Sequence, residues 1–337
     1  MPNKTPDGII LSCKSFRLEK KEIDFFSKIN PFGFILFSRN FKSKSQVKKL
    51  ISDLKIITKN SEALIFVDQE GGKVQRFNND EFSTIPDQRY FGNIYKKSKK
   101  KGLKLSYLNA RIIAHELKDI GIDVNCSPVL DLYRQNANKI IDSRSFGSHA
   151  KTVTELGRQY CIAFLDGGIL PVIKHFPGHG RAKVDSHLDL PIIKTAKHIL
   201  LNHDIKPFKK LNDQIFIMIS HILYEKLDKK IAPYSKKILI KLLKEKLKFN
   251  GLTISDDISM LALKGSLKKR IKSCYVGGCD LVMYCSGDLR EMKTIYEFSK
   301  PIEKKKFEYF KNFIRNNKVK KINIKKARKK VYESRII

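Results

Sequence analysis

The chain has 337 residues, with 68 lysines and arginines against 34 aspartates and glutamates, and a formal net charge of +34 at pH 7. Its apolar fraction of 42% is that of an ordinary globular protein, so a sizeable core can be buried. The first residues lack the basic-then-apolar pattern of a signal peptide, and no apolar run approaches the ~20 residues of a membrane span. We therefore expect a cytoplasmic protein without membrane insertion.

The large positive charge raises the question of a nucleic-acid-binding protein. Lysine supplies most of this charge and is dispersed in short runs, such as the one at residues 96–101. Nucleic-acid surfaces tend to concentrate arginine and to add aromatic side chains that stack on bases. Dispersed lysines are more simply explained as part of a solvated surface than as a nucleic-acid-binding site. We predict no nucleic-acid partner, although a general attraction for anionic ligands is expected.

Eight short apolar runs recur along the chain, each followed by polar or turn residues. They span residues 8–11, 32–37, 63–67, 122–129, 168–173, 214–219, 251–254 and 280–284. Between them, residues 46–57 and 103–120 have the i, i+3, i+4 apolar spacing of helices that pack on a sheet. Eight strands alternating with helices predict an α/β fold, a single (β/α)8 TIM-type barrel.

The domain organisation is predicted to be simple. No Pro/Gly/Ser-rich linker divides the chain, so we expect residues 1–337 to form one catalytic barrel domain. From about residue 300 to 337 the chain is lysine-rich, with Phe307, Phe310 and Phe313 at helical intervals. We expect this region to form a surface helix that covers the barrel.

Polar residues follow the third predicted strand, where residues 68–76 include two glycines, two carboxylates and a guanidinium. Paired glycines let a backbone approach a ligand closely. Asp68 and Arg76 suit sugar hydroxyls or an anion, but the residues alone leave open a surface ion pair between Glu70 and Arg76. Arg144 follows on a long loop and, taken alone, is predicted to be solvated.

The densest group of titratable side chains follows the fifth predicted strand, at residues 174–187. Its proline and glycines break regular structure, so Lys174 and the polar residues after it are predicted to lie on a long loop. The carboxyl ends of parallel strands are where chemistry gathers in such folds. Asp185 is two residues from His187 and could accept its N–H and favour its charged form, which would suit His187 for general acid catalysis.

A metal site is the rival interpretation of this group, with His175, His179, Asp185 and His187 as ligands. The spacing matches no known zinc pattern, and Lys174 would oppose a cation. We therefore predict neither a metal nor a cofactor. The six cysteines contain no C-x-x-C pair and are expected to be buried free thiols.

Asp256 and Asp257 follow the seventh predicted strand, where charge is costly unless it has a role. Alternation along a strand would point one carboxylate toward the barrel axis and the other away. A carboxylate at the barrel mouth can attack a carbon that develops positive charge, as in glycoside hydrolysis. The alternative is that these aspartates cap a following helix at residues 258–260, which is plausible for Asp257.

Together these motifs resemble those of bacterial β-N-acetylglucosaminidases of glycoside hydrolase family 3. The resemblance covers most of the chain from Gly8 to about Cys285. It is carried, in the same order, by residues 68–76, 127–131, 144–147, 174–180, 185–187 and 255–260.

The resemblance implies a one-domain barrel that removes non-reducing terminal β-linked N-acetylglucosamine with retention of configuration. By the matching positions, Asp256 would be the nucleophile that forms a glycosyl-enzyme intermediate. His187 would be the general acid/base, oriented by Asp185. The residues that would hold the terminal sugar are Asp68, Arg76, Arg144, Lys174 and His175.

Single-domain bacterial members of this type are cytoplasmic and act in peptidoglycan recycling. The resemblance therefore implies a saccharide or muropeptide substrate, N-acetylglucosamine linked to 1,6-anhydro-N-acetylmuramic acid with or without peptide. A basic surface would attract the carboxylates of such substrates. We expect a monomer, and whether phosphate can replace water as the acceptor stays open.

Overall fold

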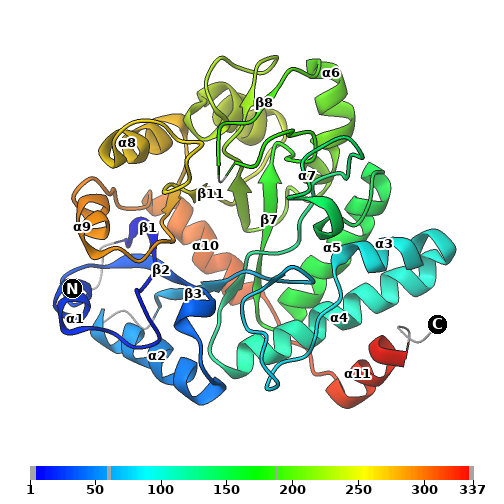
Figure 1. The fold of residues 1–337 in the computed structure, drawn as a ribbon, viewed down its shortest axis with the longest axis horizontal. Helices are drawn as coiled ribbons and strands as arrows, with labels where there is room; N and C mark the ends of the chain where they lie inside the picture. Colours follow the sequence, from blue (N-terminus) through cyan, green and yellow to red (C-terminus); the bar gives the residue numbers. More distant parts are fainter. Residues whose placement is uncertain (1–4, 59–61, 187, 334–337) are drawn as a thin grey trace.

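Eight parallel strands close into a barrel in the computed structural model, which describes residues 5–58, 62–186 and 188–333 (Figure 1). Around the barrel the strand order is β1-β12-β11-β9-β7-β6-β3-β2. The strands are β1 (Asp7–Leu11), β2 (Pro31–Leu36), β3 (Leu64–Val67), β6 (Val124–Asn125), β7 (Leu170–Phe176), β9 (Phe216–Ile219), β11 (Leu252–Asp257) and β12 (Leu281–Met283). All eight predicted strands are therefore present, and the predicted TIM-type barrel is confirmed.

Helices surround the barrel and cover its strands (Figure 1). They are α1 (Lys20–Phe26), α2 (Lys44–Ile57), α3 (Gln88–Lys97), α4 (Lys99–Asp119), α5 (Ala150–Asp166), α6 (Lys197–Ile199), α7 (Lys206–Lys210), α8 (Leu267–Gly277), α9 (Leu289–Glu297), α10 (Lys304–Asn316) and α11 (Ile324–Glu333). The π-helical segment Leu200–Asp204 precedes α7, and the π-helical segment Lys237–Lys246 precedes β11 in the sequence. The helices predicted at 46–57 and 103–120 correspond to α2 and α4.

Within the described residues, two short sheets lie outside the barrel. Strands β4 (Gln69–Gly71) and β5 (Val74–Gln75) form an antiparallel pair directly after β3. Strands β8 (Ile192–Ile193) and β10 (Leu223–Tyr224) pair in parallel. The first pair folds the segment that follows β3 back over the carboxyl end of the barrel.

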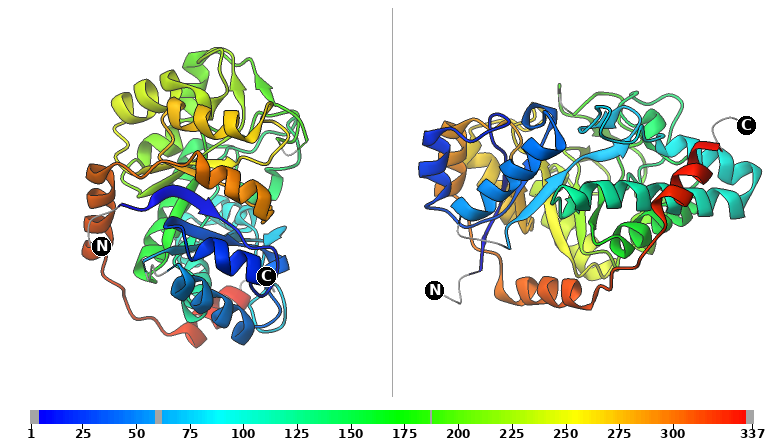
Figure 2. Two further views of the ribbon diagram at one scale, coloured as in Figure 1. Left: turned by 90° about the vertical axis from the view of Figure 1, so that its left-hand side faces the viewer. Right: turned by 90° about the horizontal axis from the view of Figure 1, so that it is seen from below.

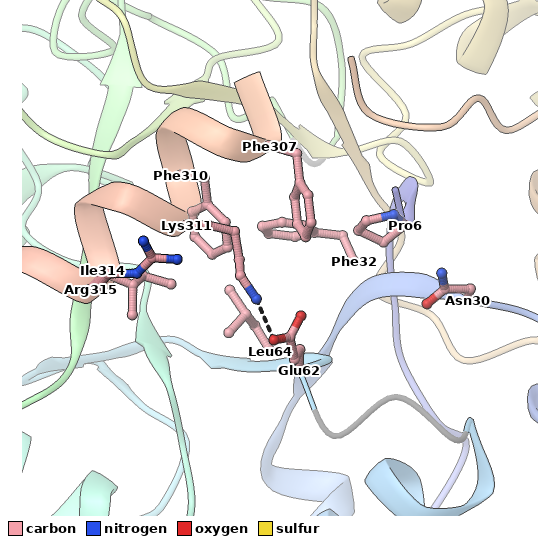
Figure 3. A pocket seen from close by; sticks show the side chains of 10 residues that line it. All are labelled: Pro6, Asn30, Phe32, Glu62, Leu64, Phe307, Phe310, Lys311, Ile314 and Arg315. Atoms are coloured by element: carbon pink, nitrogen blue, oxygen red, sulfur yellow. Dashed lines mark hydrogen bonds and ion pairs between the residues drawn. The ribbon is translucent and has the colours of Figure 1, made fainter. Parts of the chain in front are cut away.

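The amino-terminal end of the barrel is closed by α10, which lies across it (Figure 2). Phe310 is 3% exposed, and its ring centroid lies 5.2 Å from that of Phe32 and 5.7 Å from that of Phe216. A cavity of about 460 Å³ remains beside these rings, with the ion pair of Lys311 and Glu62 at its edge (Figure 3). Helix α10 lies within the region from about residue 300 to 337 where the sequence predicts a surface helix.

Two strand boundaries differ from the predicted ones. Strand β6 has only two residues because Pro128 interrupts the predicted run, and the pairing with β7 resumes as a single bridge between Val129 and Lys174. Strand β7 continues to Phe176, so the prediction that Lys174 and His175 lie on a loop is wrong. Both residues are held in the barrel wall, where charge needs a partner.

No helix within residues 5–58, 62–186 and 188–333 is long and apolar enough to cross a membrane. The six cysteines are free thiols; five are buried and Cys285 is half-buried. This agrees with the absence of disulfides expected from the sequence.

Candidate active site

The carboxyl ends of the strands open on a pocket of about 400 Å³. Its walls come from the ends of β3, β7, β9, β11 and β12 and from the loops that follow β3, β6 and β7. Because the strands are parallel, side chains that are far apart in the sequence meet at this one end. The pocket therefore contains most of the polar residues singled out from the sequence.

A buried network of charges forms one wall of the pocket. Lys174 is 2% exposed, and its Nζ lies 2.8 Å from Oδ1 of Asp68 and 2.5 Å from Oε1 of Glu70. Arg144 donates to both oxygens of Glu70, from Nε and Nη2, at 2.8 Å each. Arg76 donates from Nη2 to Oδ2 of Asp68 at 3.3 Å. Three cations thus surround two carboxylates, with a bidentate pair at the centre.

Mutual compensation keeps these groups charged. Burial by itself would raise the pKa of Asp68, but Lys174 and Arg76 outweigh it and hold that pKa below its usual range. Burial opposes a low pKa for Glu70 as well, and Arg144 and Lys174 again lower it. Burial disfavours the charge on Lys174, whereas Asp68 and Glu70 raise its pKa. The wall therefore presents fixed donors and acceptors, which suit the hydroxyl groups of a sugar.

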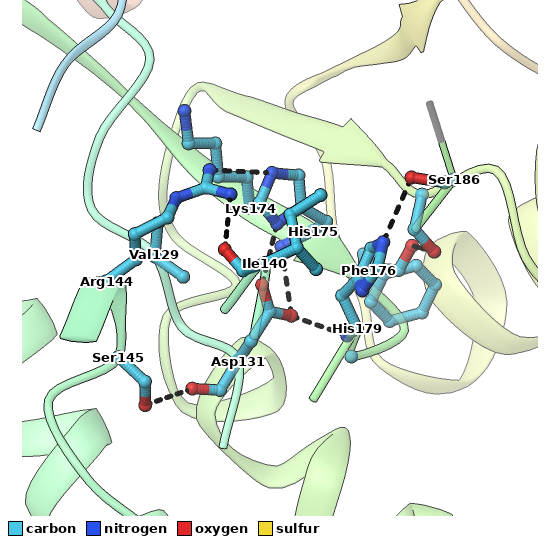
Figure 4. Close-up of polar contacts among 12 residues, drawn as sticks. Val129, Asp131, Ile140, Arg144, Ser145, Lys174, His175, Phe176, His179 and Ser186 are labelled. Atoms are coloured by element: carbon cyan, nitrogen blue, oxygen red, sulfur yellow. Dashed lines mark hydrogen bonds and ion pairs between the residues drawn. The ribbon is translucent and has the colours of Figure 1, made fainter. Parts of the chain in front are cut away.

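Asp131 joins two histidines beside this wall (Figure 4). It is fully buried, and burial would raise its pKa, but His175 and the hydrogen bonds that it accepts lower it. As an ionised carboxylate it can only accept, so Nδ1 of His175 donates to Oδ2 at 2.6 Å. Oδ1 accepts from the backbone N–H of His179 at 2.6 Å. Nε2 of His175 lies 3.5 Å from Nη2 of Arg144 and lines the pocket.

The loop after β7 returns to the pocket at Asp185 and Ser186, which both line it. The loop packs closely on the β6 loop, since a Cβ added to Gly180 would lie 1.8 Å from the carbonyl oxygen of Leu132. Nε2 of His179 is within hydrogen-bond distance, 3.1 Å, of Oγ of Ser186. The following residue, His187, lies outside the described residues.

Asp256 and Asp257 end β11, and both line the pocket. Asp257 accepts from the backbone N–H and hydroxyl of Ser259, at 3.0 and 2.6 Å, and from the backbone N–H of Cys285 at 3.1 Å. Burial raises the pKa of Asp257, although these bonds oppose it. Oδ1 of Asp256 accepts from the backbone N–H of Asp257 at 2.8 Å. Asp257 thus closes a turn. In the described part of the chain no helix follows until α8, so the alternative of a helix cap at residues 258–260 is wrong.

Seven of the eight site residues predicted from the sequence line this pocket: Asp68, Arg76, Arg144, Lys174, His175, Asp185 and Asp256. The eighth, His187, lies outside the described residues. One expectation and one alternative interpretation, each taken from single residues, are wrong. Only 12% of the side chain of Arg144 is exposed, and Glu70 pairs with Arg144 and Lys174, not with Arg76 at the surface.

Sequence reasoning gave Glu70, Asp131 and His179 no role in sugar binding or catalysis. Glu70 lies two residues after Asp68 and so could have been placed on the same face of the chain. Asp131 follows a short apolar run, a signal equal to that of Asp68. Among the described residues, no group of three or more histidine, cysteine and carboxylate side chains could hold a metal ion.

Comparison with known proteins gives consistent matches. A family model described as the glycosyl hydrolase family 3 N terminal domain matches residues 11–333. Beta-hexosaminidases of Methylobacillus flagellatus and Psychromonas ingrahamii are 36% identical over 258 residues and 34% identical over 283 residues. These alignments cover 75% and 82% of this chain, and 73% and 82% of the relatives. The crystal structure of NagZ from Neisseria gonorrhoeae in complex with N-trifluoroacetyl-D-glucosamine is similar with a TM-score of 0.89, 28% identity and 99% coverage of both chains.

Proposed function

The chain belongs to glycoside hydrolase family 3, and from this membership we propose that, as a β-N-acetylhexosaminidase, it removes non-reducing terminal β-linked N-acetylglucosamine from peptidoglycan fragments. The curated relatives are named beta-hexosaminidases, and the similar Neisseria structure contains an N-acylated glucosamine. The observation that carries the proposal is the single pocket where Asp256 and Asp185 meet the buried charges around Lys174.

The buried charges support sugar binding by Asp68, Arg76, Arg144, Lys174 and His175. Carboxylates accept hydrogen bonds from hydroxyl groups, and the lysine and arginine side chains donate them. The ion pairs already fix these side chains before a sugar enters, so little ordering is needed on binding. The terminal sugar would therefore meet a preorganised site.

We assign the chemistry to Asp256, His187 and Asp185. A carboxylate oxygen of Asp256 attacks the anomeric carbon as the bond to the leaving oxygen breaks, and His187 gives that oxygen a proton. Water then gives a proton to His187 while its oxygen attacks the same carbon and releases Asp256. Two inversions yield net retention. Asp185 orients the imidazole. The nucleophile is assigned to Asp256 from the motif match, and the three hydrogen bonds that Asp257 accepts hold the Asp257 carboxylate in a turn.

The substrate proposal extends to N-acetylglucosamine linked to 1,6-anhydro-N-acetylmuramic acid, with or without peptide. The net charge of +34 supports it, because lactyl and peptide carboxylates are anionic. We further propose that residues 1–337 act as one catalytic domain, as a monomer and in the cytoplasm.

The first test is substrate selectivity. Purified protein is incubated with a chromogenic β-N-acetylglucosaminide and with the matching glucoside, with and without phosphate, and the products and their first-formed anomer are identified by NMR. We expect release of β-N-acetylglucosamine and little action on the glucoside. Release of the α anomer first would contradict the retaining mechanism, and loss of activity in EDTA with recovery in zinc would favour a metallohydrolase.

The second test locates the nucleophile. A 5-fluoro glycoside that keeps the acetamido group should trap the intermediate on Asp256, and peptide mapping identifies the labelled residue. Asp256→Ala should lose several orders of magnitude in rate because the covalent route is removed. Labelling of Asp257 or Asp68 would contradict the assignment.

A further inference from the structure

The carboxylate of Asp131 ties together two parts of the site that have different tasks in the proposed function. One oxygen holds the ring of His175, a proposed sugar ligand, through the 2.6 Å bond to Nδ1. The other holds the backbone of His179, 2.6 Å from its N–H, at the start of the loop that leads to Asp185. The backbone N–H of His175 also lies 3.3 Å from this second oxygen. A displacement of Asp131 would therefore move both histidines.

His179 then connects this carboxylate to the far part of the same loop. Its side chain is buried, and Nε2 lies 3.1 Å from Oγ of Ser186, which is also buried. Burial and the neighbouring His175 lower the pKa of His179 to about 4, so the ring is neutral at neutral pH. A neutral imidazole can accept from the serine hydroxyl or donate to it, and either arrangement makes one hydrogen bond.

The cost of this arrangement indicates a purpose beyond packing. Nδ1 of His179 has no hydrogen-bond partner among the described residues, although it is buried. A buried polar atom without a partner destabilises a fold, whereas an apolar side chain of similar size would not. The bond from Nε2 to Ser186 is what an apolar side chain could not provide.

The base of the loop has anchors of its own. The backbone N–H of Asn138 donates to the carbonyl of Ala182 at 2.8 Å, and Nε of Arg181 donates to Asp204 at 2.8 Å. The contact of His179 with Ser186 lies beyond these anchors in the sequence. It therefore holds the segment adjoining Asp185, the part of the loop that faces the pocket.

We propose that His179 is a positioning residue for the acid/base step: through Ser186 it holds the segment at Asp185, which orients the acid/base in the proposed function, and through Asp131 it is tied to the sugar ligand His175. The inference rests on the proposed role of His187. The loop position and the sugar site are thereby set by one connected group of side chains, Asp131, His175, His179 and Ser186.

The experiment compares Ser186→Ala, His179→Leu and His179→Gln with the unaltered enzyme. Glutamine places an amide nitrogen or oxygen the same number of bonds from Cα as Nε2 of histidine, so it can keep the bond to Ser186. Ser106→Ala is the matched control. Ser106 is equally buried, but among the described residues its hydroxyl bonds only to the carbonyl of Leu103 within α4. Melting temperatures verify that each variant is folded.

The measurement is kcat/KM for aryl β-N-acetylglucosaminides whose leaving groups range from dinitrophenol to phenol. Poor leaving groups need a well-placed acid, and misplacement by about 1 Å can cost ~100-fold. We expect Ser186→Ala and His179→Leu to lose roughly 10- to 100-fold on the phenyl substrate but less than about threefold on the dinitrophenyl one. His179→Gln should recover most of the loss, and Ser106→Ala should show none.

The variant His187→Ala, measured in parallel, tests the acid/base assignment separately from the positioning role of His179. If its rate depends steeply on the leaving group while Ser186→Ala and His179→Leu lose equally on all substrates, the positioning role is wrong and the proposed function stands. If His187→Ala itself shows no dependence on the leaving group, the acid/base assignment fails, and the positioning role fails with it.

Discussion

A lysine side chain that is 2% exposed persists at position 174 because two carboxylates compensate its charge. The same compensation works in reverse: Asp68 and Glu70 are tolerated in a buried wall because Lys174 and two arginines face them. Buried charges of this kind contribute little net stability as a set, yet the removal of one member leaves the others uncompensated. The network therefore serves the site more than the fold.

Lys174→Met should be strongly destabilising. The substitution keeps most of the side-chain volume but removes the ammonium between Asp68 and Glu70. We expect the free energy of unfolding to fall by about 3–5 kcal/mol, measured by urea unfolding at neutral pH, together with loss of activity. Lys241→Met is the control, because Lys241 is 72% exposed and, in the part of the chain that the structure describes, pairs only with Glu245. Its free energy of unfolding should change by less than about 0.5 kcal/mol. Equal effects of both substitutions would refute the argument.

His179 should make stability depend on pH. Its pKa is about 4 in the folded protein, lowered from 6.5 by burial and by His175, while Asp131 opposes the shift. Above pH 6.5 the ring is neutral in both the folded and the unfolded chain. As the pH falls from 6.5 toward 4, the unfolded chain binds a proton that the folded one does not, so stability decreases by up to about 3 kcal/mol.

Urea unfolding at several pH values checks this, with His179→Gln as the reference that lacks the titrating group. The difference in unfolding free energy between the two proteins should be constant above pH 7 and shift against the unaltered enzyme between pH 6.5 and 4. A difference that does not vary over this range would show that His179 titrates normally.

Sequence reasoning at the residue scale identified which side chains gather but not which ones pair. Arg144 lies 74 residues from Glu70 in the sequence, and no local pattern indicates that contact. The parallel pairing of β3 with β6 brings the β6 loop over the end of β3. The expectation that Arg144 is solvated was therefore wrong, although its membership of the site followed from the motif.

At the scale of single elements, the apolar runs predicted where strands occur better than where they end. Pro177 and Gly178 predict the end of regular structure, and this pattern places the polar residues before them on the loop. Strand β7 instead keeps Lys174 and His175, because buried partners satisfy them and Phe176 still pairs with Ile219 of β9. Polarity is a poor boundary signal at a site that compensates its own charges.

Helix α10 provides a test of how the barrel is closed at the end opposite the site. Phe310 fills the space against Phe32 and Phe216, so Phe310→Ala should open a cavity and destabilise the fold by about 3–5 kcal/mol. Because the change is remote from the pocket, KM should be unaltered at temperatures where the variant is folded. Tyr309→Ala on the same helix is the control, since Tyr309 is 40% exposed. Thermal and urea unfolding measure both, and a larger loss for Tyr309→Ala would contradict this packing.

At the scale of the whole molecule, the eight apolar runs were sufficient to predict the barrel, because a (β/α)8 barrel consists of eight buried strands that alternate with helices. The excess of lysine has no part in that prediction. Most of the excess lysine side chains remain solvated, because the chain has only 34 acidic residues for its 68 basic ones. The result is a molecule whose long-range field favours anionic ligands, whatever the fold.

This field should be visible in the salt dependence of catalysis. A positively charged enzyme attracts a substrate with carboxylates, and added salt shortens the range of that attraction, from a Debye length of about 30 Å at 0.01 M to about 8 Å at 0.15 M. We expect kcat/KM for an N-acetylglucosaminyl-anhydromuramyl substrate to fall severalfold, up to about tenfold, over this range. The same disaccharide with its lactyl carboxylate amidated should change by less than about twofold, since it carries no charge for the field to act on. The two substrates share every contact of the terminal sugar, so the difference between their salt profiles isolates the charge. If both profiles decline in parallel, salt acts on the enzyme itself, and the lysine surface has no role in substrate capture.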